Sequence, residues 1–203
     1  MLLVIDESGD DTGSQHRYVV AAACLSSAAE APALAAELRQ RVFADPARTR
    51  EFHWRREGHV MRSAVLALLA GRGAIAVVDR ISLQADQEAA RAECLTELFR
   101  TVADRGGVVE QVMIESREAQ PVNRGQNHRD HATIVEARHG RLLQPAVTYG
   151  WYPKTEPLGW LADAVAGAVM ESLRGDDRTL ELARAAADWF EVRFVGESGS
   201  KNA

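Results

Sequence analysis

The sequence predicts an α/β protein in which a mixed, five-stranded sheet is flanked by helices. Short apolar runs rich in Val, Ile and Ala recur along the chain, and each has the length of a buried strand. Between these runs lie longer segments whose apolar residues stand three and four positions apart, which is the spacing of amphipathic helices. An alternation of the two patterns is typical of a sheet with helices packed on its faces.

The first two strands are predicted at residues 1–5 and 18–25. A polar connection joins them, which favours an antiparallel pair. All five residues of the first run are apolar, so we expect that strand to be buried on both faces. Ser26 and Ser27 can then cap a helix over residues 28–43.

The middle of the chain is expected to contain two helices and two strands. Apolar periodicity predicts helices over residues 59–70 and 84–104. Glycines follow both segments, and glycine is the residue on which helices most often end. The apolar runs at 74–78 and 108–114 are the predicted third and fourth strands.

The last part of the chain begins with a polar loop and a short helix. Residues 116–129 carry Pro, Gly and Asn, so we expect a loop there, followed by a helix at 130–139. An aromatic run at 145–152 is the predicted fifth strand. Two further helices are expected over residues 158–173 and 179–194.

The length and composition indicate one globular domain. The chain has 203 residues, of which 46% are hydrophobic and 26% are charged. We expect a single domain over residues 1–195 and a disordered polar tail over 196–203. The formal net charge of -5 gives no general attraction to nucleic acid, so such a partner would need a local basic surface or bridging metal ions.

The cysteines and the hydropathy give an expected location. The two cysteines, Cys24 and Cys94, form no disulfide framework, which favours a reducing cytoplasm. The apolar run that opens the chain has no basic residues before it, so no signal peptide is expected. No apolar stretch reaches the length of about 20 residues that spans a bilayer, so we expect no membrane segment.

Two carboxylates stand directly after predicted strands. Asp6 follows the first strand and Glu115 follows the fourth. If these strands are parallel neighbours, the two side chains emerge side by side at one edge of the sheet. The plainer alternative is that residues 6–10 (DESGD) are only a hairpin turn, because Asp, Ser and Gly are ordinary turn residues.

Three further residues are candidates for the same site. Asp163 lies in an apolar helix, where a charge is costly unless it is paired or binds a metal, although it is also near enough to the helix start to favour the helix dipole. Glu51 and His53 are two positions apart in a charged segment and would face the same side of an extended chain. That segment can equally be an exposed edge with its aromatic residues turned inward.

The most basic part of the sequence is residues 117–141. Its five arginines predict either a solvated surface or a rim that contacts phosphates. These arginines are Arg117, Arg124, Arg129, Arg138 and Arg141. A further hypothesis is a zinc site formed by three histidines of the same region, His128, His131 and His139, although no cysteine is nearby.

Four short motifs, taken in order, resemble the DUF3800 family. They are DESGD at 6–10, EFHW at 51–54, the strand-terminal Glu115, and LADAVAGAV at 161–169. The resemblance extends from Val4 to about Leu173. It implies a fold similar to the ribonuclease H-like and RuvC-like folds.

The resemblance also implies roles for the candidate residues. Asp6, Glu115 and Asp163 correspond to the acidic metal ligands, and Glu51 and His53 correspond to the middle motif. Carboxylate oxygens suit Mg²⁺ or Mn²⁺, and the chemistry they support is two-metal hydrolysis of phosphodiester bonds.

We therefore expect a metal-dependent nuclease that acts on RNA, DNA or a hybrid. The alternative is a non-catalytic nucleic-acid-binding or regulatory module on the same fold. The acidic net charge and the Glu at position 115, where the family more often has Asp, favour that alternative.

Overall fold

Six strands form one mixed sheet in the order β5-β4-β1-β2-β3-β6. The computed structural model describes residues 1–9, 17–80, 87–118 and 125–195. Strand β2 runs antiparallel to β1 and β3, whereas β1, β4 and β5 run parallel to one another, as do β3 and β6. The strands are β1 (Leu2–Gly9), β2 (Arg17–Leu25), β3 (Gly73–Arg80), β4 (Gln111–Glu115), β5 (Thr148–Tyr152) and β6 (Trp189–Phe194).

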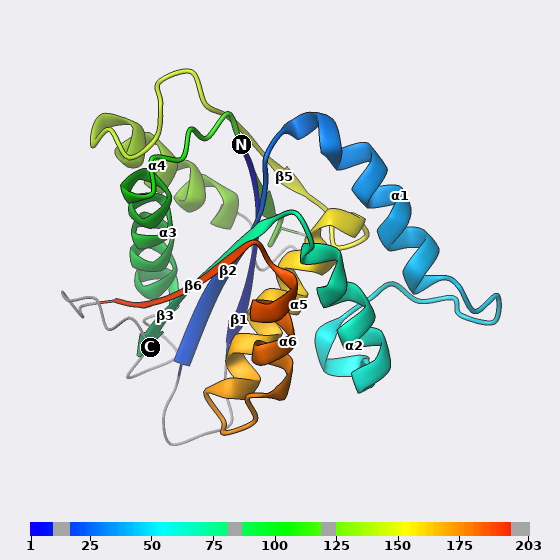
Figure 1. Cartoon of the computed structure of the whole chain (residues 1–203). Coiled ribbons are helices and arrows are strands. Elements are labelled where there is room, and N and C mark those ends of the chain that lie inside the picture. Colours follow the sequence, from blue (N-terminus) through cyan, green and yellow to red (C-terminus); the bar gives the residue numbers. More distant parts are fainter. Residues whose placement is uncertain (10–16, 81–86, 119–124, 196–203) are drawn as a thin grey trace.

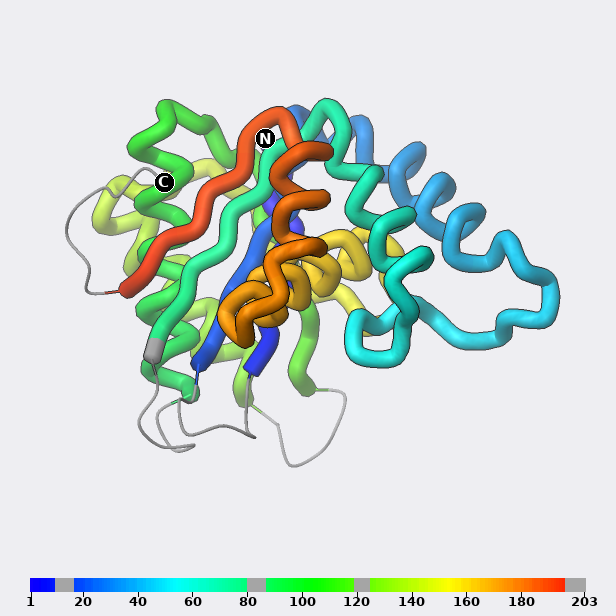
Figure 2. The backbone as a smooth tube through the Cα atoms, turned by 60° about the horizontal axis from the view of Figure 1, so that its bottom comes forward, coloured from blue at the N-terminus to red at the C-terminus, as the bar shows by residue number. Residues whose placement is uncertain are grey.

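Helices cover both faces of the sheet (Figures 1 and 2). Each face has its own apolar cluster of side chains from the sheet and from the helices packed on it. One face carries α1 (Ala31–Val42), α2 (His59–Leu66), α5 (Pro157–Ser172) and α6 (Arg178–Ala186). The other face carries α3 (Gln87–Asp104) and α4 (Gln126–His139). These are called the α5 face and the α3 face below.

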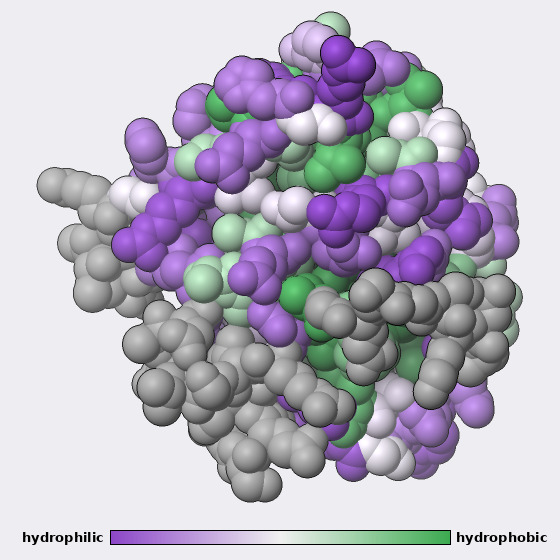
Figure 3. Space-filling model, turned by 90° about the vertical axis from the view of Figure 1, so that its left-hand side faces the viewer, coloured by the Kyte–Doolittle hydropathy of each residue, from purple (hydrophilic) through white to green (hydrophobic). Residues whose placement is uncertain are grey.

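The exterior on the α3 side is largely polar. Figure 3 shows hydrophilic side chains over much of this side, with smaller apolar patches between them. The apolar residues of α3 point instead to the sheet, as expected for an amphipathic helix. None of the described helices is long and apolar enough to cross a membrane.

Strand β1 determines which face each of its side chains meets. Its first four residues are buried on both faces, as predicted. Leu2 and Val4 belong to the cluster on the α5 face, and Leu3 and Ile5 to the cluster on the α3 face. Because side chains alternate along a strand, the next residue, Asp6, is directed to the α5 face.

Strand β1 extends beyond its predicted end at residue 5, so the alternative of a hairpin turn directly after that residue is wrong. Strand β1 continues to Gly9, and its residues from Asp6 onward pair with residues Ala21 to Tyr18 of β2. The paired neighbour extends the strand, although the local sequence favours a turn. Position 10 of the DESGD motif lies outside the described residues, as does the predicted tail over residues 196–203.

The sheet has six strands rather than the predicted five. The expected helix over residues 179–194 ends at Ala186, and β6 follows it and pairs with β3. From Phe190 to Phe194 apolar and charged residues alternate, which is a strand pattern that the helical interpretation missed. Gly73 makes this pairing possible, because a Cβ there would lie 2.0 Å from the Trp189 ring.

Candidate functional site

Asp6 and Glu115 lie at the same end of neighbouring strands. Strands β1 and β4 are parallel, as the sequence analysis required, and their ladder ends with Ile5 opposite Ile114. Asp6 and Glu115 are the next residue on each strand. Both follow residues of the α3-face cluster, so both side chains turn to the α5 face.

The five candidate residues line one cavity of about 400 Å³. They are Asp6, Glu51, His53, Glu115 and Asp163. Four segments that are distant in sequence carry them: β1, the end of β4, the chain before α2, and the N-terminal half of α5. The structure thus brings together the residues that sequence analysis selected separately.

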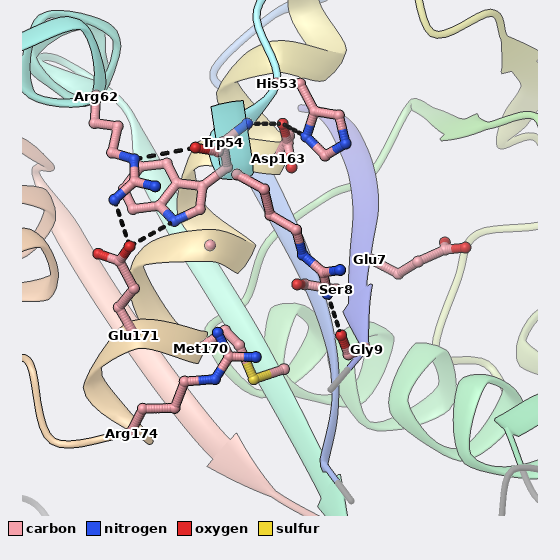
Figure 4. A pocket seen from close by; sticks show the side chains of 12 residues that line it. Glu7, Ser8, Gly9, His53, Trp54, Arg62, Asp163, Met170, Glu171 and Arg174 are labelled. Carbon is pink, nitrogen blue, oxygen red and sulfur yellow. Dashed lines mark hydrogen bonds and ion pairs between the residues drawn. The ribbon is translucent and has the colours of Figure 1, made fainter. Parts of the chain in front are cut away.

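Asp163 is held by the segment that carries His53. Its Oδ2 atom accepts a hydrogen bond of 2.8 Å from the backbone N–H of Trp54 and lies 3.6 Å from Nδ1 of His53 (Figure 4). A half-buried carboxylate needs such partners in an apolar helix. Gly167, one turn further along α5, permits this approach, because a Cβ there would lie 2.2 Å from the Trp54 ring.

Trp54 is anchored by a network that sequence analysis missed. Its ring nitrogen donates to Glu171 over 3.2 Å, and the Arg62 guanidinium lies 4.5 Å from its ring centroid (Figure 4). Arg62 also forms an ion pair with Glu171 and donates to the Trp54 carbonyl over 3.0 Å. The network fixes residues 53 and 54 against α5, and with them the contacts of Asp163.

Asp6 is the most confined carboxylate of the cavity, with 6% of its surface exposed. Its Oδ1 atom accepts a hydrogen bond of 2.7 Å from the N–H of Glu7. Burial raises the pKa of Asp6 well above its usual range, and the charges of Glu115 and Asp163 raise it further. The cavity therefore concentrates negative charge that the surrounding protein does not fully compensate.

Lys154 is a cation in this cavity that sequence analysis did not select. Its Nζ atom lies 2.7 Å from Oε1 of Glu115, although 71% of its side chain is exposed. Burial lowers the pKa of Lys154, but the hydrogen bond to Glu115 and the charges of Asp6 and Asp163 outweigh this, so the net pKa is raised. Its position two residues after β5, the neighbour of β4, was the available signal.

The donor atoms of the cavity fit a hard divalent cation. Asp6, Glu115 and Asp163 offer carboxylate oxygens, which Mg²⁺ and Mn²⁺ prefer. In the part of the chain that the structure describes, no three His, Cys, Asp or Glu side chains already stand close enough to share one ion. Lys154 pairs with Glu115, and the Trp54 amide donates to Asp163. A bound ion would therefore require the carboxylates of Glu115 and Asp163 to turn inward.

The predicted arginine rim lies on the α3 face, away from the cavity. Arg117 pairs with Glu88 and Asp130, and only 11% of its side chain is exposed. Arg138 donates to the Val147 carbonyl and lies over the ring of Tyr149.

Two other arginines of this group are exposed, Arg129, which pairs with Glu88, and Arg141. Arg124 lies outside the described residues. Of the three histidines proposed for zinc, His131 forms a 2.6 Å hydrogen bond with Tyr149 through Nδ1 instead.

No protein-family model matches the chain, and no curated protein matches it. The site is defined by its geometry and by the chemistry of its residues. That geometry is a cavity at the carboxyl ends of β1 and β4, lined by carboxylates, one histidine and several cationic side chains.

Proposed function

We propose that the protein is a metal-dependent phosphodiester hydrolase that acts on nucleic acid. The observation that carries the proposal is the convergence of Asp6, Glu115 and Asp163 on one cavity, with Glu51 and His53 on its wall. Crowded carboxylates repel one another, and a divalent cation relieves this repulsion while it attracts an anionic substrate. A cavity of this kind is suited to chemistry on phosphate esters.

The sheet supports the more specific proposal of a ribonuclease H-like fold. An antiparallel β3-β2-β1 unit continues on the other side of β1 with the parallel strands β4 and β5. This arrangement puts the first strand inside the sheet, and Asp6 and Glu115 are the residues directly after the end of the β1–β4 pairing. The resemblance of the sequence to the DUF3800 family favours the same fold.

Each of the five candidate residues has a role in the proposed reaction. Asp6, Glu115 and Asp163 would hold the metal ions, which when bound stabilise the attacking and leaving oxygens. His53 is exposed at the cavity and close to Asp163, so it can transfer a proton to or from the substrate. Glu51 is exposed on the same wall and can orient a water molecule.

The proposal predicts cleavage that depends on both the ion and Asp163. Labelled RNA, DNA and hybrid duplexes are incubated with the purified protein in Mg²⁺, in Mn²⁺ and in EDTA. We expect products only with the ions, and a strong loss of product in the Asp163→Asn variant. Glu37→Gln is the matched control, because it also converts a carboxylate to an amide but lies exposed on α1.

Equal cleavage by the wild type and Asp163→Asn would overturn the proposal. Binding of nucleic acid without cleavage under all these conditions would favour the alternative, a non-catalytic module on the same fold.

A second prediction concerns Lys154, because its ammonium group pairs with Glu115 and would compete with a metal ion for that carboxylate. Changing Lys154 to Met should tighten Mn²⁺ binding by about threefold, the range expected when a weak exposed ion pair no longer competes. Titration calorimetry with Mn²⁺ measures the change. Lys154→Arg keeps the charge and should bind Mn²⁺ like the wild type; weaker Mn²⁺ binding by Lys154→Met would contradict the prediction.

A further inference from the structure

Arg56 is an exposed arginine on the wall of the acidic cavity. It lines the cavity together with Asp6, Glu115 and Asp163. Its guanidinium forms no hydrogen bond or ion pair with any residue that the structure describes, in contrast to Lys154, which pairs with Glu115. An exposed arginine without such contacts, next to the proposed phosphodiester-cleaving site, can bind a phosphate group of the substrate.

Arg50 and Arg55 extend this cationic surface along the same segment. Arg50 is exposed and lines the cavity, and its guanidinium donates to the Arg56 carbonyl over 3.0 Å. Arg55 is exposed on the adjoining hollow of about 380 Å³, where it donates to the Gly9 carbonyl. The two hollows share Glu7, His53 and Asp163 on their walls, so they adjoin each other.

The segment that carries these arginines is held firmly. Phe52 and Trp54 are buried between the exposed residues, and Trp54 is anchored on Gly167 and Glu171. Glu57, also buried, forms an ion pair of 2.7 Å with Arg48 at the other end of the segment. A surface that is fixed before the substrate arrives loses little conformational entropy on binding.

We propose that the basic surface formed by Arg50, Arg55 and Arg56 contacts the phosphodiester backbone of the nucleic acid and leads it into the cavity. The proposal rests on the proposed function, because it gives that site a path for its substrate. It also reassigns the binding surface, since the arginines of residues 117–141 lie on the opposite face and two of the described ones are engaged in the fold.

The test compares two variants that each remove two positive charges. Arg50→Gln with Arg56→Gln changes the proposed surface. Arg129→Gln with Arg141→Asn changes the exposed arginines of the α3 face, and Asn suits position 141 because the φ angle there is +61°. Fluorescence anisotropy measures the binding of a labelled single-stranded oligonucleotide, with Ca²⁺ as the divalent cation, over a series of salt concentrations.

We expect the Arg50 and Arg56 variant to bind roughly 25-fold more weakly at about 0.1 M salt, with a salt slope lower by about 1.4, because each phosphate contact on a single strand contributes about 0.7. The Arg129 and Arg141 variant should bind like the wild type. Arg56→Gln alone should reproduce half of the change in slope, and it breaks no contact among the described residues that would affect folding.

Equal weakening in both double variants, or weakening only in the α3-face variant, would overturn the inference and leave the proposed function standing. No oligonucleotide binding by the wild type would also overturn it. Cleavage by the wild type, measured separately, then decides whether the proposed function fails with it.

Discussion

Replacing Asp6 with Asn is expected to abolish metal-dependent cleavage and, at neutral pH, to raise the melting temperature of the metal-free protein. The rate of cleavage should fall about a thousandfold. The variant lacks one ligand of the metal ions, and such ions stabilise the transition state by several kcal/mol. The gain in stability should be about 1 kcal/mol, or roughly 3 °C for a chain of this size. Asn keeps the oxygen that accepts from the Glu7 N–H.

The sign of the stability change follows from the raised pKa of Asp6. Burial and the charges of Glu115 and Asp163 raise this pKa, so the folded protein holds the proton more tightly than the unfolded chain does. Such a group lowers the free energy of unfolding as the pH rises from the ordinary aspartate pKa, about 4, towards the raised value. The metal-free Asp6→Asn variant should therefore be more stable than the wild type at neutral pH and equally stable in acid.

Thermal denaturation at several pH values, with and without Mn²⁺, measures these effects. Mn²⁺ should raise the melting temperature of the wild type more than that of Asp6→Asn, since the variant has lost a ligand. The exposed variant Glu37→Gln should follow the wild type throughout. A metal-free Asp6→Asn protein that melts below the wild type at neutral pH would show that Asp6 stabilises the fold.

The second large effect is expected on the α3 face, where Arg91 is 1% exposed. Arg91 forms a bidentate pair with Asp130, at 2.8 and 3.1 Å, and an ion pair with Glu7. Replacing it with Met should lower the free energy of unfolding by about 3 kcal/mol, because Glu7 then loses its ion pair and, among the described residues, the buried Asp130 keeps only the longer contact of 3.3 Å with Arg117. Glu7 is the neighbour of Asp6, so this pair also fixes the end of β1.

Urea denaturation measures the loss, with Arg100→Met as the control on the same helix. Arg100 is exposed and, among the residues that the structure describes, pairs only with its helical neighbour Glu97, so its loss should cost less than about 1 kcal/mol. Combining Arg91→Met with Asp130→Leu should restore part of the stability, since the buried carboxylate that lost its bidentate partner is then absent, and Arg117 keeps its ion pair with Glu88. Equal losses for Arg91→Met and Arg100→Met would contradict the role of Arg91.

The sequence was sufficient to predict the elements and the site residues wherever the local pattern and the tertiary environment agree. Five strands and most of the helices were predicted near their observed positions, because residues such as Leu2 to Ile5 are apolar enough to be buried on any sheet. Asp6 and Glu115 were found because each follows such a strand directly. Asp163 was found because a charge stands out in an apolar helix.

The errors arose where a distant neighbour decides the structure. Residues 6–9 have turn-forming side chains, but pairing with β2 makes them strand. Residues 189–194 were assigned to a helix, and only the open edge of β3 shows that they form β6. Local propensity is too weak to resist such pairing.

By itself the sequence determined the α/β class, the central apolar run and the acidic residues that follow it. Only the tertiary structure decided that Lys154 neutralises Glu115, that Trp54 holds Asp163, and that the arginines beside the cavity are those of residues 50–56. The physical reason is that ion pairs and hydrogen bonds depend on distances of a few ångströms between side chains tens of residues apart. The sequence carries no local pattern for these distances, because the packing of the whole chain sets them.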